Sequence, residues 1–315
     1  MKKKFIITGI GSLFLFTLIL ISCSSAENEI SKEAVHKIDD LLNRRVIVVV
    51  KAIKEDKLLA NQDQYNRVYQ SEIERSVVLL NYFNKRQEIM STAIKEIEEG
   101  YKELDLLFSK YNKGEPGFDL INSVRNYFYH YKQFFDAASQ DLDNKVKAII
   151  LYKTIVSLET NQQSFFNALE LNKINQVELL LNNEAKLIDE YKQTIYQVDF
   201  DAEIPDEWKK EFVDTYIQMH EWNKKFYEAK KQNDDVLYSQ LRKEGANLLW
   251  DIPYNKTSKF NNELEKILFE TPIEIDDLEI ESREAGMEAY ELYYIHKKKI
   301  GENPYEFKKK LNEIK

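Results

Sequence analysis

Few side chains of this chain could carry nucleophilic or metal chemistry. Cys23 is the only cysteine among its 315 residues. A single thiol excludes an intrachain disulfide and a zinc site built from several cysteines. The four histidines are far apart in the sequence: His36, His130, His220 and His296. Glu33 and His36 form one Glu-x-x-His pair, whereas a di-iron bundle needs two such pairs, so we predict no metal site.

Enzyme motifs are also missing from the sequence. It contains no Gly-x-Ser-x-Gly, P-loop, Gly-x-Gly-x-x-Gly or His-Glu-x-x-His pattern. Adjacent carboxylates such as Glu98-Glu99, Asp234-Asp235 and Asp276-Asp277 are uninformative among 54 acidic residues, because acid–base catalysis needs shifted pKa values in a cleft. We therefore predict that the protein is not an enzyme and has no catalytic residue and no cofactor.

Cys23 closes a segment with the features of a secretory signal. A basic start, Met1-Lys2-Lys3-Lys4, precedes an apolar run over residues 5–21 and the ending Leu20-Ile21-Ser22-Cys23. This ending resembles the lipobox of Gram-positive bacterial lipoproteins. The resemblance implies a signal peptide over residues 1–22, cleavage between Ser22 and Cys23, and diacylglycerol on the Cys23 sulfur. The alternative is an uncleaved anchor, for which about 17 apolar residues are near the lower limit.

Either interpretation anchors the chain in the cell membrane and places its body on the extracytoplasmic face, with residues 23–29 as a tether. Without Lys2, Lys3 and Lys4, 42 Lys and Arg face 54 Asp and Glu, which gives a net charge of −12. This balance argues against nucleic acid as a partner and restricts any contact with anionic wall polymers to a local patch.

The C-terminal region contains such a patch. Residues 261–291 have a net charge of −9, whereas residues 292–315 have a net charge of +4. Six lysines lie there among aromatic residues: Lys297, Lys298, Lys299, Lys308, Lys309 and Lys310. One hypothesis is contact with lipid head groups or phosphate-bearing wall polymer. The alternative is that Lys297–Lys299 form the last turn of a helix before Gly301, where cations are favoured.

A short motif lies next to this patch. Glu291-Leu292-Tyr293-Tyr294 resembles the motif of the EMYY-motif lipoproteins of Gram-positive cocci, with Leu292 where Met is expected. A lipobox before a long helical body is also similar to the putative cell-wall-binding lipoproteins of Gram-positive bacteria. Neither resemblance implies a defined activity.

Long helices must position these residues, because the chain has only 8 Gly and 5 Pro. We predict an all-α fold: an elongated, antiparallel, coiled-coil-like bundle over residues 30–200, then a region of shorter helices over residues 205–315. The first helix is predicted over about residues 30–60, although Val46–Val50 is a β-branched run. The strongest turn signal is Asn112–Gly117, with two Gly and one Pro.

Apolar residues recur every 3.5 positions on both sides of this turn. Eleven of 13 positions fit from Tyr69 to Tyr111, in a helix predicted over residues 62–112, and ten of 11 fit from Ile121 to Val156, with Lys145 as the exception. The pattern then fails and resumes from Ile174 to Val198, with Glu184 as the exception. This shift and a polar run predict a turn near residues 158–164; the alternative is one bent helix.

Further breaks define the C-terminal part. Pro205 with Asp206 and Glu207 predicts the first turn of a helix that ends near residue 233. Asp234 is expected to cap the next helix, which continues to Trp250, and residues 251–255 form a loop. Shorter helices are predicted over about residues 257–269, 275–299 and 304–314.

One cluster of aromatic residues allows two interpretations. Tyr127, Tyr129 and Tyr131 alternate with phenylalanines, which suits an aromatic groove for glycan or peptide, or a bundle core with hydroxyls at its edge. Together, the sequence predicts a lipid-anchored binding or envelope-structural protein with a protein or wall polymer as its partner. The alternatives are a solute-binding lipoprotein of a transporter and a cell-envelope hydrolase.

Overall fold

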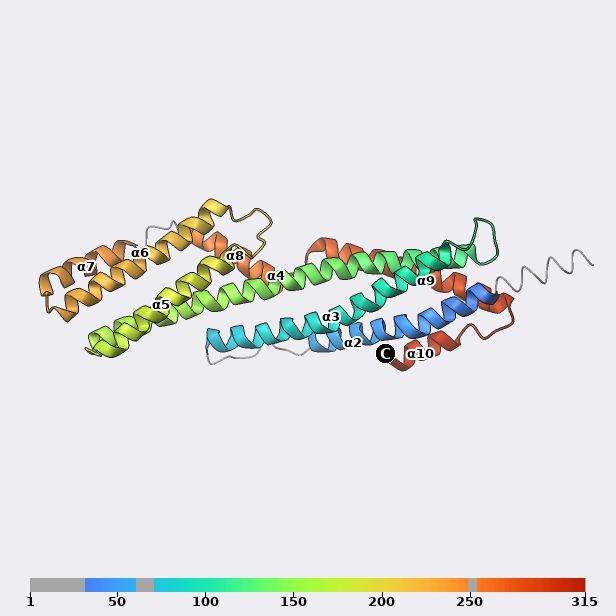
Figure 1. The fold of residues 1–315 in the computed structure, drawn as a ribbon, viewed down its shortest axis with the longest axis horizontal. Helices are drawn as coiled ribbons and strands as arrows, with labels where there is room; N and C mark the ends of the chain where they lie inside the picture. Colours follow the sequence, from blue (N-terminus) through green and yellow to red (C-terminus); the bar gives the residue numbers. More distant parts are fainter. Residues whose placement is uncertain (1–31, 61–70, 249–253, 315) are drawn as a thin grey trace, which may run out of the picture. The chain divides into compact units, whose positions relative to one another are not determined.

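A computed structural model describes residues 32–60, 71–248 and 254–314, and the predicted all-α fold is confirmed (Figure 1). The described residues form helices joined by turns and contain no strand. After a helical stretch over residues 32–41, the elements are η1 (Leu42–Val46), α2 (Ile47–Ala60), α3 (Glu72–Phe108), α4 (Phe118–Glu170), α5 (Ile174–Ile195), α6 (Asp206–Lys231), α7 (Asp235–Leu248), α8 (Tyr254–Phe269), α9 (Ile273–Lys299) and α10 (Glu306–Ile314).

The first helix agrees with its prediction, since residues 32–60 are helical throughout. The β-branched run at Val46–Val50 is therefore helix and not strand. One feature was not predicted: η1 is a π-helical turn, Leu42–Val46, within this helix. Such turns insert an extra residue into the helical repeat and change which side chains share a face.

The predicted turn between the two long helices is also confirmed. Gly114 and Gly117 have φ angles of 96° and 91°, which favour glycine. The Asn112 amide nitrogen donates to the Glu115 carboxylate at 2.8 Å and helps to close the turn. A Cβ at Gly117 would lie 2.7 Å from Cβ of Ala34, so glycine also permits close approach of the first helix.

The turn predicted near residues 158–164 is wrong, because α4 continues without interruption to Glu170. The polar run is a helix face that meets α5. Asn161 is buried, donates to the Leu180 carbonyl at 3.0 Å and accepts from Asn183 at 2.9 Å. The helix ends instead at Glu170, and Asn172 in the turn directly after it has a left-handed φ of 53°.

The shorter helices lie close to their predicted bounds. Pro205 is the N-cap of α6, and the backbone N–H of Leu237 donates to the Asp234 carboxylate at 2.9 Å, which confirms that cap. Tyr254 and Asn255 belong to α8 and not to a loop. The remainder of the predicted loop and Trp250 lie outside the described residues.

The described chain divides into two compact units. Of the described residues, unit 1 comprises 32–60, 88–139 and 272–314, and unit 2 comprises 71–87, 140–248 and 254–271. This division differs from the predicted boundary near residue 200. The reason is that α9 and α10 return to pack with the N-terminal helix, and α10 lies beside α2 (Figure 1). Helices α3 and α4 contribute to both units.

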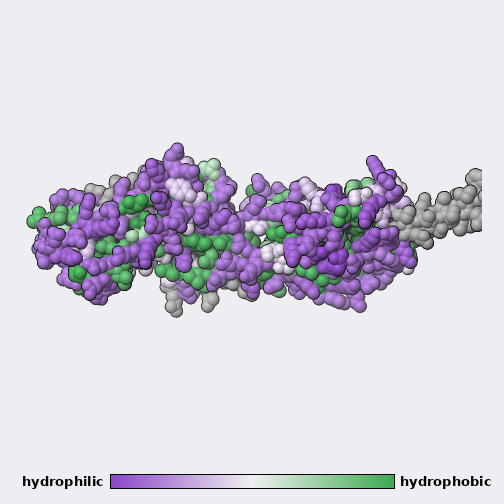
Figure 2. Space-filling view, in the orientation of Figure 1, coloured by the Kyte–Doolittle hydropathy of each residue, from purple (hydrophilic) through white to green (hydrophobic). Residues whose placement is uncertain are grey.

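The predicted apolar seams are buried faces. Phe83, Ile97 and Leu104 of α3 and Phe128 and Phe135 of α4 are almost completely buried. Hydrophilic residues cover most of the visible surface, with hydrophobic patches between them (Figure 2). The charged exceptions in the seams, Lys145 and Glu184, are buried as well, so each must have polar partners inside its unit.

Candidate binding cavity

Unit 1 contains an apolar cavity of about 470 Å³. Four helical segments line it, from η1 and α2, α4, α9 and α10. The lining residues are Leu42, Val46, Val50, Val124, Tyr127, Tyr131, Arg283, Gly286, Met287, Ala289, Tyr290, Phe307 and Leu311. Its volume falls in the range of about 300–1,000 Å³ typical of small-molecule sites.

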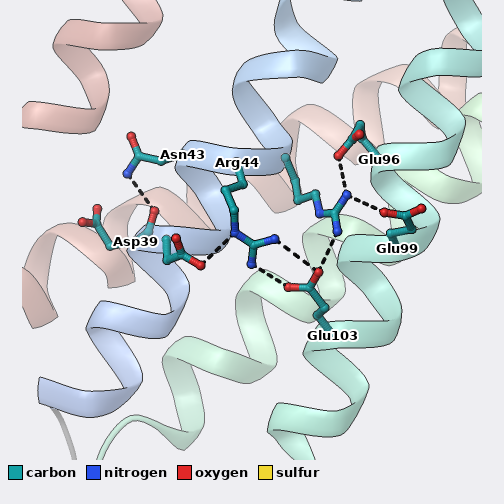
Figure 3. A network of polar contacts seen from close by, with 8 residues as sticks. Asp39, Asn43, Arg44, Glu96, Glu99 and Glu103 are labelled. Carbon is teal, nitrogen blue, oxygen red and sulfur yellow. Dashed lines mark hydrogen bonds and ion pairs between the residues drawn. The ribbon is translucent and has the colours of Figure 1, made fainter.

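The π-helical turn gives one helix two roles. Leu42 and Val46 of η1 line the cavity, whereas Arg44 and Arg45 between them point to α3. Arg45 is largely buried and pairs with Glu96 at 2.6 Å, with Glu99 at 2.5 Å and with Glu103 at 2.8 Å (Figure 3). These ion pairs fix η1 against α3.

The electrostatics of this network follow from its geometry. Three carboxylates raise the pKa of Arg45 above its already high usual value. In turn, hydrogen bonds from Arg44 and Arg45 lower the pKa of Glu103. Arg45 and Glu103 are therefore charged near neutral pH, and these ion pairs hold one wall of the cavity in place.

Tyr127 and Tyr131 form another wall. Burial raises the pKa of Tyr127 well above its usual value and also raises that of Tyr131, and the centres of the two rings lie 4.7 Å apart in an edge-to-face arrangement. Phe128 and Phe135 are core residues, and Tyr129 is exposed. The aromatic cluster is thus mainly core, as one interpretation predicted, but two of its tyrosines line an open volume.

Tyr290 of α9 is the least satisfied polar group at the cavity. Its hydroxyl oxygen is buried and has no hydrogen-bond partner among the described residues. Burial raises its pKa, with a further contribution from Tyr305. The Lys308 ammonium lies 6.0 Å from the centre of its ring. An unsatisfied buried hydroxyl costs about 1–3 kcal/mol, so Tyr290 is a candidate donor to a ligand.

Only some of the lysines in the predicted patch are exposed to solvent. The prediction is wrong for Lys297, which is 3% exposed and pairs with Asp39 at 3.3 Å and with Glu302 at 3.0 Å. Lys310 donates to Asn43 at 2.8 Å. The remaining four are exposed: Lys298, Lys299, Lys308 and Lys309.

The alternative interpretation of Lys297–Lys299 is confirmed, since they form the last turn of α9. Gly301 has a φ of 76°. The Gly301 N–H donates to the Lys298 carbonyl at 3.2 Å, and the Glu302 N–H donates to the Lys297 carbonyl at 3.0 Å. These bonds form a Schellman cap. The cap turns the chain so that α10 returns along α2.

The remaining sequence candidates have structural partners. Tyr293 of the Glu-Leu-Tyr-Tyr motif is buried and donates to Asp39. Glu33 pairs with Lys37, and His36 lies 2.5 Å from Glu302, so the Glu-x-x-His pair is not arranged around a common point. Cys23 and Ser22 lie outside the described residues.

Unit 2 has a polar centre of a different kind. Glu184 is buried, lies 2.7 Å from Nδ1 of His220 and accepts from Asn223 at 2.7 Å. Lys145 pairs with Asp141 at 2.6 Å and donates to the Glu270 carbonyl at 2.8 Å. Both charged interruptions of the apolar seams thus have protein partners.

Two further observations limit the chemistry. Within the described ranges, no cluster of three or more His, Cys, Asp or Glu side chains is arranged to hold a metal ion. None of the helices in that part of the chain combines the length and apolar character needed to cross a membrane.

The class that these features define is an all-α protein with an apolar cavity that is open to solvent on one side. No protein-family model matches the sequence, and no curated protein or solved structure is detectably similar to it. Sequence reasoning missed Tyr290, Met287 and Leu311. Only the 3.6-residue repeat of α9 and α10 could have placed them on inward faces, and no repeat shows that a face borders a cavity.

Proposed function

We propose that this protein is a lipid-anchored binding protein of the extracytoplasmic face of the cell membrane. Diacylglycerol on Cys23 is its attachment, and the cavity of unit 1 is its binding site. The lipobox-like ending at Cys23 supports the attachment, since basic start, apolar run, small residue and cysteine occur in the expected order.

The observation that carries the binding role is the cavity itself. Protein interiors are normally close-packed, and apolar surface left exposed to water in a concave pocket costs free energy. Unit 1 nevertheless keeps about 470 Å³ open between four helical segments. A ligand that enters would recover this cost, which is the usual reason for a preformed apolar pocket with few polar groups.

The anchor is tested by expressing the full chain in a Gram-positive host with radiolabelled palmitate. We expect label on the wild-type protein, partition into the detergent phase, and a loss of about 22 residues on maturation. The Cys23→Ala variant should lose label and cleavage together. The Ser22→Ala variant is the matched control and should keep both, because small residues are accepted before the cysteine. Label on Cys23→Ala would contradict the proposal.

The lysine-rich surface remains a separate proposal. Four lysines of this surface are exposed: Lys298, Lys299, Lys308 and Lys309. We propose separately that they contact an anionic wall polymer. Sedimentation of the full chain with purified teichoic acid at low salt should retain the wild type. A Lys298→Glu/Lys309→Glu variant should be released, and equal retention of both would contradict a role for these lysines.

A further inference from the structure

We propose that the cavity of unit 1 binds the chain of a free fatty acid and places its carboxylate beside Tyr290 and Lys308. This inference rests on the proposed binding role and names the ligand class. It combines the apolar walls, the unpartnered hydroxyl of Tyr290 and the cationic side of α10.

The walls select a flexible apolar ligand. Leu42, Val46 and Val50 line the cavity from η1 and α2, and Phe307 and Leu311 line it from α10, which lies beside α2. Apart from Arg283, no charged side chain is among the residues that line it. Sugars, nucleotides and peptides would leave hydrogen-bonding groups unsatisfied against these walls, whereas an acyl chain has none.

The head position is set by the polar groups at Tyr290. Its buried hydroxyl can donate to an acceptor, and the Lys308 ammonium lies 6.0 Å from its ring centre. Lys298 and Lys308 also lie close enough to Tyr305 to act on it electrostatically, and Tyr305 in turn lies near Tyr290. A carboxylate satisfies the hydroxyl and complements the charge.

Arg283 is a less suitable partner for the fatty-acid carboxylate than Tyr290 and Lys308. It lies two helical turns before Tyr290 on α9 and already pairs with Glu279 at 2.5 Å. Its side chain is 60% exposed, so water also satisfies it. We therefore assign the carboxylate to the Tyr290 end and the chain terminus to the side of Arg283.

Photo-crosslinking of the full chain in lipid nanodiscs tests this assignment. The probes are a diazirine-bearing palmitic acid and the fatty alcohol of the same length, used at pH 8.5, where the carboxylate is ionised. Labelled peptides are located by mass spectrometry. We expect the acid to label peptides that contain Val46–Val50, Met287–Tyr290 or Leu311, with about five- to tenfold higher yield than the alcohol.

Variants separate the two parts of the site. Tyr290→Phe should lower labelling by both probes, whereas Tyr129→Phe, which removes an exposed hydroxyl of the same unit, should not. Lys308→Gln should lower labelling by the acid alone, with the exposed Lys309→Gln as its control. Leu311→Trp should fill the cavity and abolish labelling while circular dichroism stays helical.

Each labelling result either supports or overturns a stated part of the proposal. Equal labelling by acid and alcohol would overturn the carboxylate assignment but retain the binding role. Absence of cavity labelling by both probes would overturn both. If Leu311→Trp fails to fold, the Tyr290→Phe and Tyr129→Phe pair still distinguishes site-specific labelling from general labelling of the surface.

Discussion

Unit 1 and unit 2 each bury a polar atom that has no partner among the described residues, Tyr290 Oη in unit 1 and Asn223 Oδ1 in unit 2, but their surroundings differ. In unit 2, both carboxylate oxygens of Glu184 have partners from α6. Aromatic rings pack elsewhere in the same unit, where the ring of Phe226 stacks on Trp222 and on Tyr238 with centre-to-centre distances of 4.8 Å and 4.3 Å. In unit 1, Tyr290 lacks a partner among the described residues and borders an open volume. A buried polar group enclosed by packed side chains indicates a structural role, whereas Tyr290, which lacks a partner and borders an open volume, is a candidate contact for a ligand.

The largest effect is expected at the polar centre of unit 2. Glu184→Leu keeps the side-chain volume but leaves His220 and Asn223 without their acceptor. We expect a loss of about 3–5 kcal/mol in the free energy of unfolding, measured by chemical denaturation. Glu190→Ala, at an exposed position of the same helix, should change it by less than about 0.5 kcal/mol. A small effect of Glu184→Leu would show that this centre is not structural.

Gly100 tests the packing of unit 1. Helix propensity alone predicts that Gly100→Ala stabilises the protein by about 1 kcal/mol. A Cβ there would lie 2.2 Å from the ring of Phe128, so we expect instead a destabilisation of about 2 kcal/mol. The double variant Gly100→Ala/Phe128→Leu should recover part of the loss. Stabilisation by the single variant would contradict the close contact of α3 and α4.

The ion network at η1 should have a smaller effect. Arg45→Met leaves three carboxylates close together and should cost about 1.5 kcal/mol at pH 7, between the values for exposed and buried pairs. Arg44→Met, at a more exposed position, should cost less. Because the pKa of Glu103 is lowered in the folded state, the stabilisation exists above its unfolded pKa and is lost as pH falls through the folded value. The difference between Arg45→Met and wild type should therefore shrink at low pH.

Tyr290→Phe is expected to have the smallest effect and the opposite sign. It removes a buried hydroxyl that has no partner among the described residues, so the ligand-free protein should gain about 0.5–1 kcal/mol. Tyr129→Phe loses an exposed hydrogen bond from Gln133 and should be neutral or slightly destabilising. Thermal melts of both variants would measure the contrast. Destabilisation by Tyr290→Phe would mean that its hydroxyl has a partner inside the protein.

Helix positions were predictable because they depend on local signals. The glycines at 114 and 117, the cap at Asp234 and the apolar seams each act within a few residues. The continuity of α4 through Asn161 was not predictable, since its polar run is stabilised by Leu180 and Asn183 of another helix. Long-range contacts of this kind override the local pattern.

The candidate site was less predictable than the fold. The basic patch was detected from composition, but Lys297 proved to be buried because Asp39 and Glu302 come to it from distant parts of the chain. The cavity depends on the volume left between helices from residues 42–50, 124–131 and 283–311. No spacing within one helix encodes that volume.

The most direct test of the central claim is an experimental structure of the full chain purified from its own membrane. We predict continuous density of an apolar chain between Val46 and Leu311, ending within hydrogen-bond distance of the Tyr290 hydroxyl. A cavity filled by side chains, with Tyr290 bonded to another residue of the protein, would contradict it.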